Sequence, residues 1–158
     1  MIKTLGIIPA RYASTRFPGK PLIDIAGKSM IQRVYEQCSK SESLSKVVVA
    51  TDDQRIFEEV HNFGGHVLIT DAEHQSGTDR CFEALSKMGG QFDYIVNIQG
   101  DEPMINPKQI DLLTSLFDGQ TELATLVKEI TDEEDIFNPN VVKVVLDKNG
   151  RALLFSSA

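Results

Sequence analysis

Short apolar runs alternate with segments of helical period along most of the chain. The runs VVVA (47–50) and YIVNI (94–98) are continuous rather than alternating. Continuous apolar runs are typical of strands that are buried on both faces of a parallel sheet. Strands are predicted at residues 4–9, 46–50, 66–69, 94–98, 123–128 and 141–146.

Between these runs, apolar residues recur at the spacing of amphipathic helices. In residues 53–63, Ile56, Val60 and Phe63 fall on one face, and Gly64 follows where a helix should end. Helices are predicted at residues 30–39, 53–63, 79–88 and 107–117. The element order βαβαβαβαβ predicts an α/β protein with a Rossmann-like, three-layer αβα architecture and a mostly parallel mixed sheet.

The pattern changes in the last part of the chain. Residues 131–137 are predicted to form a short acidic turn, and LDKNGRALLF (146–155) two strands joined at Asn149-Gly150. The second strand runs to Ala158 without a following cap, so we expect the chain to be a fragment of a longer protein. Its 158 residues, 41% of them hydrophobic, are enough for a single domain spanning 1–158.

The formal charge is −7, with 16 Lys and Arg against 23 Asp and Glu, which argues against nucleic-acid or membrane-surface binding. The first 23 residues nevertheless hold four cations and no acid, so this segment is predicted to attract an anion. Cys38 and Cys81 lie in helical patterns outside any CxxC motif, which predicts buried thiols without disulfide or zinc. The first apolar run is too short for a signal peptide or a membrane helix, so we expect a cytoplasmic protein.

Three of these cations follow the first predicted strand, where open α/β sheets bind ligands. Arg11 and Arg16 offer forked donors, and Lys20 offers a compact charge. Small residues in the same loop allow close backbone approach: Ala10, Ala13, Ser14 and Gly19. The combination suits a polyphosphate, although surface cations are often merely solvated. The loop matches neither GxxxxGK[ST] nor GxGxxG, which argues against a P-loop or dinucleotide site.

Two carboxylates follow the fourth predicted strand in NIQGDEP (97–103). Magnesium is commonly held by one or two carboxylates, substrate oxygens and waters, so Asp101 alone is an adequate protein ligand. A Gly-Asp-Glu-Pro sequence by itself is more often a simple turn. The sequence therefore predicts a Mg²⁺ ligand here only in combination with the cationic loop.

The segment HQSGTDR (74–80) places hydroxyls and a glycine before a predicted helix, where they could contact a base or a ribose. A helix cap at Thr78 is the compatible structural alternative. Asp52 and Asp53 are predicted to cap a helix rather than to form a carboxylate dyad. His61 and His66 have no partner at ligand spacing and are predicted to be structural.

Five segments together resemble the 3-deoxy-manno-octulosonate (Kdo) cytidylyltransferases, the CMP-Kdo synthetases of Gram-negative bacteria. They are IIPARYASTRFPGKPL (7–22), VATDD (49–53), HQSGTDR, NIQGDEP and FNPNVVKVV (137–145). The resemblance covers essentially the whole chain and implies a nucleotide-diphospho-sugar transferase fold. It also implies a Mg²⁺-dependent reaction of CTP with Kdo that gives CMP-Kdo and pyrophosphate for lipopolysaccharide biosynthesis, by a protein that is a homodimer at full length.

The same resemblance implies roles for individual residues. Arg11 and Lys20 would bind the CTP phosphates and, with Asp101 as the Mg²⁺ ligand, would be catalytic. Gln99 would lie between nucleotide and sugar, and Arg16 would serve either the sugar carboxylate or the phosphates. The nucleotide-binding residues implied are Pro9, Ala10, Arg11, Lys20, Ser76, Gly77, Thr78, Arg80 and Gln99.

The chain departs from the family in two ways. The family is considerably longer, and its later part carries further sugar contacts, a second metal-binding aspartate and much of the dimer interface. The family also has Phe-Ser-Arg where this chain has Phe155-Ser156-Ser157, which leaves amino-Kdo open as the acceptor. CMP-sialic acid synthesis and a noncatalytic role as a nucleotide-binding fragment are also compatible with these residues.

Overall fold

The computed structural model describes residues 2–13 and 17–156. The chain divides into two compact units, Met1–Ala124 and Thr125–Ala158, each of which is described by itself. The single domain predicted from the sequence stays a prediction.

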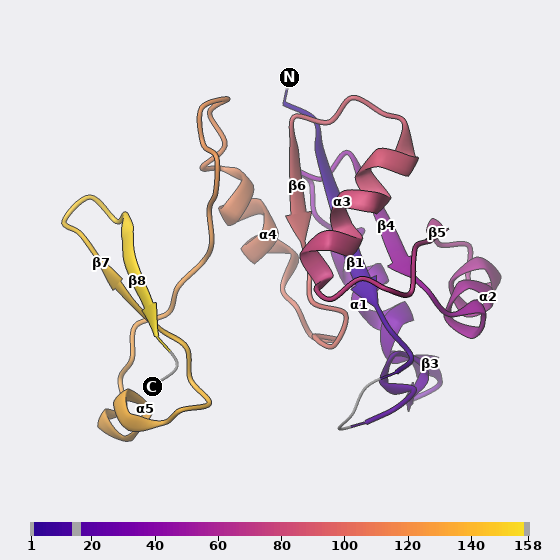
Figure 1. Cartoon of the computed structure of the whole chain (residues 1–158), viewed down its shortest axis with the longest axis horizontal. Helices are drawn as coiled ribbons and strands as arrows, with labels where there is room; N and C mark the ends of the chain where they lie inside the picture. The colour runs from indigo at the N-terminus through magenta and orange to yellow at the C-terminus, as the bar shows by residue number, and fades with distance from the viewer. Residues whose placement is uncertain (1, 14–16, 157–158) are drawn as a thin grey trace. The chain divides into compact units, whose positions relative to one another are not determined.

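The first unit is built on a four-stranded sheet in the order β5-β4-β1-β6 (Figure 1). Its strands are β1 (Thr4–Ala10), β4 (Lys46–Thr51), β5 (Val67–Ile69) and β6 (Tyr94–Asn97). All three pairings are parallel, and Ile7 of β1 lies opposite Val48 on one side and Asn97 on the other. The four strands predicted for this region are confirmed, each within one residue at either end.

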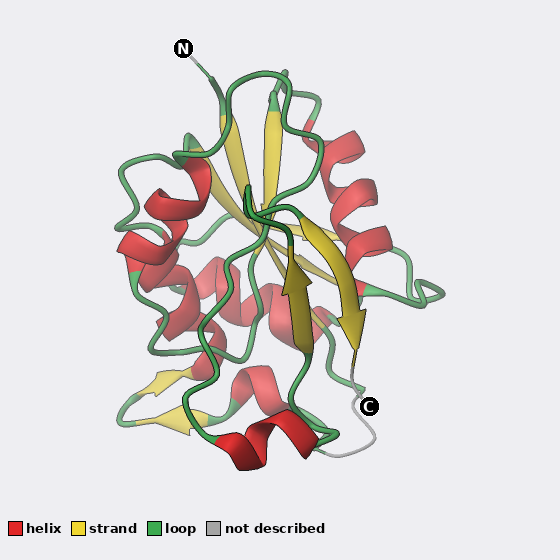
Figure 2. Cartoon of the chain, turned by 90° about the vertical axis from the view of Figure 1, so that its left-hand side faces the viewer, coloured by secondary structure: helices red, strands yellow, loops and turns green. Residues whose placement is uncertain are grey.

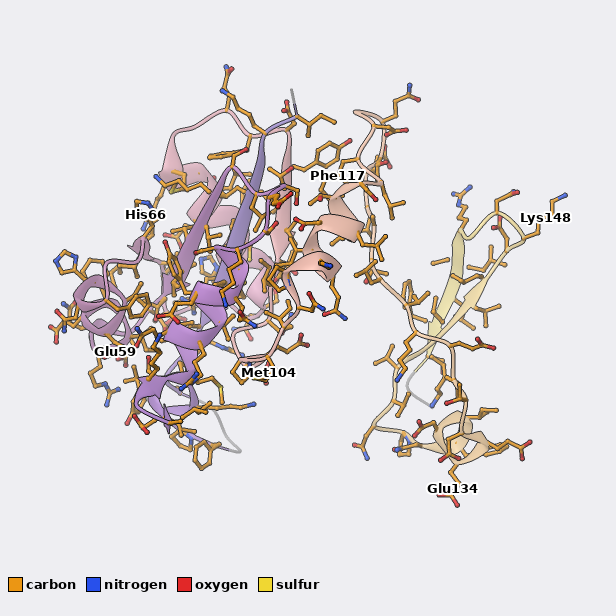
Figure 3. All side chains as sticks on the ribbon, turned by 180° about the vertical axis from the view of Figure 1, so that it is seen from behind. Glu59, His66, Met104, Phe117, Glu134 and Lys148 are labelled. Atoms are coloured by element: carbon orange, nitrogen blue, oxygen red, sulfur yellow. The ribbon has the colours of Figure 1, made fainter. Side chains whose placement is uncertain are left out.

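Four helices connect and cover these strands: α1 (Met30–Cys38), α2 (Gln54–Asn62), α3 (Gly77–Met88) and α4 (Pro107–Thr114). The predicted start of α4 is confirmed, because Asn106 forms a capping box with Gln109 and Pro107 follows it. The helix ends before the predicted residue 117. Phe117 still reaches the sheet, where its ring stacks on Tyr94 with centroids 4.2 Å apart (Figure 3).

The helices cover both faces of the sheet, which confirms the three-layer α/β class (Figure 2). Leu5 and Ile7 of β1 face α3, whereas Ile8 and Ala10 face the opposite side. On that opposite side, α1, α2 and α4 contribute the buried residues Ile31, Val34, Cys38, Ile56, Val60 and Ile110. Because successive side chains alternate between two buried faces, the strand must be apolar throughout. None of the helices formed by the described residues combines the length and apolar character needed to cross a bilayer.

Three short elements between β1 and α1 were missed by the prediction. They are the 3₁₀ helix η1 (Lys20–Leu22) and the two-residue strands β2 (Asp24–Ile25) and β3 (Lys28–Ser29), which pair antiparallel. The turn between the strands has positive φ at both Ala26 (51°) and Gly27 (82°), as expected for a tight hairpin. Elements this short carry no measurable hydrophobic period, which explains the omission.

The second unit contains the short helix α5 (Glu133–Phe137) and an antiparallel hairpin of β7 (Lys143–Leu146) and β8 (Ala152–Ser156). The predicted hairpin is confirmed, but five residues connect its strands. The Asp147 carboxylate accepts the Asn149 and Arg151 N–H groups there, and Gly150 takes φ +80°. Lys148 in this connection and Glu134 on α5 both project outward (Figure 3).

The strand predicted at residues 123–128 is wrong, because these residues form no regular secondary structure. The acidic turn predicted at 131–137 contains α5, which begins after the capping residue Asp132. An apolar run such as LATLV is compatible with a strand, but a strand also requires a partner. No described strand pairs with this segment.

Candidate nucleotide site

The three segments singled out in the sequence all follow strand ends at one edge of the sheet. The cationic loop follows β1, and the NIQGDEP turn follows the neighbouring strand β6. The HQSGTDR segment leads into α3, which packs on the face of β1 that carries Leu5 and Ile7. Carboxyl ends of adjacent parallel strands are the usual position for a ligand in this class of fold.

Pro9, at the end of β1, is the residue on which the other two segments converge. A Cβ atom added at Gly77, the first residue of α3, would lie 3.4 Å from the Pro9 ring. One added at Gly100 would lie only 2.9 Å from the Pro9 carbonyl oxygen, a distance that real Cβ atoms do not adopt. Glycine is therefore required at position 100 for the β6 turn to approach β1 this closely.

The cationic loop and the β6 turn are joined by an ion pair. The Lys20 ammonium lies 2.6 Å from the Asp101 carboxylate, and the two side chains remain 40% and 50% exposed. Lys20, the predicted phosphate-binding residue, and Asp101, the predicted metal ligand, thus lie side by side although they are 81 residues apart in sequence. Both remain accessible to a ligand. Ala10 is buried and Arg11 is exposed directly after it, whereas Arg16 lies outside the described residues.

The start of α3 is organised by Ser76 and not by Thr78, which corrects the predicted cap. The Ser76 hydroxyl accepts the Asp79 N–H (3.1 Å) and donates to the Asp79 carboxylate (2.6 Å). The helix consequently begins at Gly77, two residues earlier than predicted. Thr78 is exposed in the first turn, beside the N–H groups that the helix end leaves open.

Arg80 differs from the other candidates because its side chain is only 1% exposed. Its guanidinium donates to the Thr70 hydroxyl and, at 2.9 Å, to the Asp52 carboxylate. Asp52 and Thr70 follow β4 and β5, so Arg80 ties α3 to the ends of two strands. Asp53 alone caps α2, by accepting the Arg55 N–H, so the cap expected from this pair is confirmed for Asp53 only.

Gln99 lies next to Gly100 and is exposed at the same edge of the sheet. Among residues 2–13 and 17–156 there is no group of three or more His, Cys, Asp or Glu side chains that could hold a metal ion. The donors present therefore fit only an ion that takes most of its ligands from phosphates and water, as Mg²⁺ does. Asp101 is the carboxylate in position for that.

A cluster around Glu83, which the sequence patterns had not suggested, shapes the segment before α3. The Glu83 carboxylate accepts the Asp71 N–H (2.8 Å), pairs with Lys87 (2.6 Å) and contacts His74. The hydrogen bond from Lys87, followed by those from Asp71 and His74, lowers the pKa of Glu83 to about 2. The Glu-x-x-x-Lys spacing of Glu83 and Lys87 was the available signal for this cluster.

Replacing Glu83 with glutamine is expected to destabilise the protein at neutral pH and progressively less in acid. Because folding depresses this pKa from its usual value of 4.5 to about 2, the carboxylate's contribution is complete above about pH 5. It is lost as the pH falls through the folded-state value. Thermal unfolding of both proteins at pH 7, 5, 4 and 3 should show melting curves that converge as the pH falls. Glu73→Gln, which removes an exposed carboxylate nearby, should give a much smaller difference at every pH. If the difference in melting temperature between Glu83→Gln and the wild-type protein stays the same at every pH, Glu83 does not have the lowered pKa.

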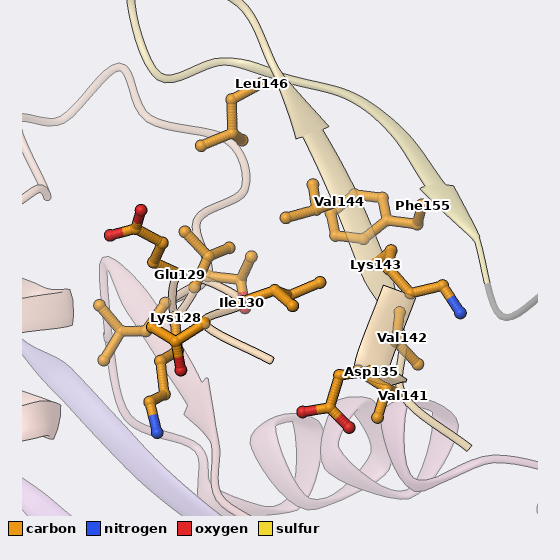
Figure 4. Close-up of a pocket in the computed structure, with 14 residues that line it drawn as sticks. Lys128, Glu129, Ile130, Asp135, Val141, Val142, Lys143, Val144, Leu146 and Phe155 are labelled. Atoms are coloured by element: carbon orange, nitrogen blue, oxygen red, sulfur yellow. The ribbon is translucent and has the colours of Figure 1, made fainter. Parts of the chain in front are cut away.

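One cavity lies wholly within the second unit and contains none of the predicted site residues (Figure 4). Its volume is about 770 Å³, and it is lined mostly by apolar side chains, among them Ile130, Val142, Val144 and Phe155. Its two lysines, Lys128 and Lys143, are accompanied by the carboxylates of Glu129 and Asp135, so it lacks the acid-free cationic character of the loop after β1.

Comparison with known proteins gives relatives along the whole chain. The 3-deoxy-manno-octulosonate cytidylyltransferase of Cytophaga hutchinsonii is 57% identical over 155 residues, which cover 98% of this chain and 62% of the relative. That of Parabacteroides distasonis is 57% identical over 161 residues, covering 99% and 63%. The chain thus spans less than two thirds of the length of these curated relatives, and the resemblance stated from the sequence is confirmed.

Solved structures agree with this assignment. The structure of a CMP:2-keto-3-deoxy-manno-octonic acid synthetase complexed with CTP superposes with a TM-score of 0.91 at 44% identity, covering 99% of this chain and 64% of that one. A 4-diphosphocytidyl-2C-methyl-D-erythritol synthase, with a TM-score of 0.66 and 14% identity over 98% and 71% of the two chains, shares the fold. The family model described as cytidylyltransferase matches residues 5–158. This chain therefore belongs to the cytidylyltransferase family.

Proposed function

We propose that this protein transfers the cytidylyl group of CTP to Kdo, giving CMP-Kdo and pyrophosphate. The observation that carries the proposal is the convergence of the three segments on Pro9, with Lys20 and Asp101 2.6 Å apart. This arrangement offers a cation for phosphates and a carboxylate for a metal at one sheet edge. Relatives that share 57% of the residues are named for this reaction, which supports the choice of substrates.

The chemistry is a phosphoryl transfer without a covalent protein intermediate. The anomeric hydroxyl of Kdo attacks the α-phosphorus of CTP, the bond to the bridging oxygen of pyrophosphate breaks, and the hydroxyl proton is lost to solvent. Arg11 and Lys20 oppose the negative charge of the phosphates, and the exposed first turn of α3 with Thr78 and the exposed Gln99 would contact the nucleoside. Positioning and charge stabilisation can supply most of the barrier reduction in such reactions.

Asp101 would hold a Mg²⁺ ion that is shared with the phosphates. When bound, the ion would neutralise phosphate charge and act as a Lewis acid. The residues fit this role because the carboxylate is half exposed and is held at the β6 end by the tight approach of Gly100 to β1. Its ion pair with Lys20 keeps the carboxylate beside the group that binds the phosphates.

Kdo is the proposed acceptor, and substrate competition would separate it from amino-Kdo and sialic acid. Ser157, on which the case for amino-Kdo rests, lies outside the described residues. A cytoplasmic role in lipopolysaccharide biosynthesis and a homodimeric full-length protein are part of the same proposal. The relatives' greater length leaves a noncatalytic nucleotide-binding chain as the second candidate.

Titration calorimetry with CTP tests the proposal, with and without Mg²⁺ and with ATP as the control. The wild-type chain is expected to bind CTP selectively, and Mg²⁺ should raise the affinity. Asp101→Asn should abolish the gain from Mg²⁺ while retaining metal-free binding, because it removes the proposed metal ligand and leaves the Lys20 ammonium to contact the phosphates. Pyrophosphate release with CTP and Kdo, measured on the same samples, separates an enzyme from a binding module. A folded wild-type chain that does not distinguish CTP from ATP would refute the proposed function.

A further inference from the structure

Tyr12, directly after Arg11, makes a stacking contact that the sequence did not indicate. The Cζ atom of Arg55, in the first turn of α2, lies 3.3 Å from the centroid of the Tyr12 ring. A guanidinium this close to an aromatic face is within the range of a strong cation–π contact. The contact links the start of the cationic loop to the element that follows β4.

Arg55 is itself fixed in place by Asp53. Its Nε and Nη2 atoms donate to the two oxygens of the Asp53 carboxylate at 2.9 and 2.6 Å, in the forked geometry that arginine favours. The same carboxylate caps α2 by accepting the Arg55 N–H at 3.0 Å, and the Asp53 N–H donates to the Thr51 hydroxyl at 3.2 Å. The guanidinium is therefore held by Asp53 at the start of α2, close to the end of β4.

Tyr12 also contacts Gly19, at the end of the cationic loop. The Tyr12 carbonyl accepts the Gly19 N–H at 2.9 Å. Gly19 takes φ +74°, and a Cβ atom added there would lie 3.1 Å from the Tyr12 ring. Tyr12 thus joins the two ends of the cationic loop, at Tyr12 itself and at Gly19. Lys20 directly follows Gly19.

We propose that Tyr12 and Arg55 are positioning residues that hold the Lys20 ammonium at the nucleotide site, a role that rests on the proposed function. The contacts run from Arg55 after β4 through Tyr12 and Gly19 to Lys20, whose ammonium pairs with Asp101 after β6. The loop is thereby braced between the strands that flank β1. Neither side chain needs to touch the substrate.

The contact acts on the free energy of holding Gly19 and Lys20 in position, and its expected effect on ligand binding is moderate. A cation–π contact of this kind changes an equilibrium constant by about threefold to tenfold. Tyr12→Leu and Arg55→Ala should each weaken CTP binding by about that factor. Tyr12→Phe, which retains the ring, should recover most of the affinity, and the double variant should be no weaker than either single variant because both remove one contact.

Amide exchange measured by NMR supplies a readout that does not require a ligand. The protection of the Gly19 N–H is expected to fall about fivefold or more in Tyr12→Leu and Arg55→Ala and to remain in Tyr12→Phe. The rate at which an acylating reagent modifies the Lys20 amine should differ from the wild-type rate in the same two variants. Gln54→Ala, on the same turn of α2, is the matched control and should leave all three measurements unchanged.

Each outcome decides the proposal. Unchanged protection of the Gly19 N–H in Tyr12→Leu and Arg55→Ala would show that the Arg55–Tyr12 contact does not hold Gly19, whether or not CTP binds. Reduced protection with unaltered CTP affinity overturns the positioning role but leaves the proposed function standing. If the wild-type chain does not bind CTP, the proposed function fails instead. Amide exchange at Gly19 and acylation of Lys20 then still decide whether Arg55 and Tyr12 hold Gly19 and Lys20 in position.

Discussion

Replacing Arg80 with methionine is expected to lower the free energy of unfolding by about 3 kcal/mol, because it breaks a buried ion pair by removing one partner. Asp52, whose side chain is 17% exposed, would lose the guanidinium 2.9 Å away, and the Thr70 hydroxyl would lose its donor. Methionine fills a similar elongated volume without a charge, so the loss reports the polar contacts rather than a cavity. Urea denaturation followed by circular dichroism measures the change.

Two further variants make the Arg80 prediction specific. Arg80→Lys keeps the positive charge but cannot donate to both partners in a fork, so it should also be destabilised, though less than the methionine variant. Arg151→Met removes an exposed arginine from the hairpin connection and should change stability by no more than about 0.5 kcal/mol. If Arg80→Met costs less than about 1 kcal/mol, the ion pair does not hold the ends of β4 and β5.

The fold was predictable where two independent signals coincide. β1 and β4 are continuous apolar runs because each buries both faces, and α4 combines a capping asparagine with a proline at its first position. The start of α3 was misplaced because Ser76 and Thr78 are both capping residues. Only the position of the Asp79 N–H, which Ser76 accepts, distinguishes them. The strand predicted at residues 123–128 is absent because an apolar pattern does not specify which strand the segment would pair with.

The site was predictable to the level of the sheet edge and no further. The rule that ligands collect at strand carboxyl ends correctly brought Lys20 and Asp101 together across 81 residues. It could not predict that Arg80 is buried against Asp52 or that Arg55 stacks on Tyr12. Those contacts depend on side-chain direction from α3 and α2, which is set by how the helices dock on the sheet.

Replacing Lys20 with alanine is expected to weaken CTP binding by about tenfold to a hundredfold. A hydrogen bond to a charged group contributes about 1.5–3 kcal/mol, and each 1.4 kcal/mol is a factor of ten in the binding constant. The variant also leaves Asp101 without its cationic partner beside the incoming phosphates. Calorimetric titration with CTP measures the effect. Lys40→Ala removes the same charge from the residues after α1, close to the amino ends of the strands, and should change the affinity by less than about twofold.

A weakened Lys20→Ala variant has two physical explanations, and the double variant with Asp101→Asn separates them in metal-free buffer. If Lys20 acts only by neutralising Asp101, removing both charges should restore the wild-type affinity, because no unpaired carboxylate remains to repel the phosphates. If the ammonium binds the phosphates directly, the double variant should stay at least about tenfold weaker than Asp101→Asn alone. We expect the second result, since the Lys20 side chain is 40% exposed and Lys20 directly follows Gly19, whose N–H is bonded to the Tyr12 carbonyl. Full recovery in the double variant would instead make the ion pair a structural link between β1 and β6 and move the phosphate-binding role to Arg11.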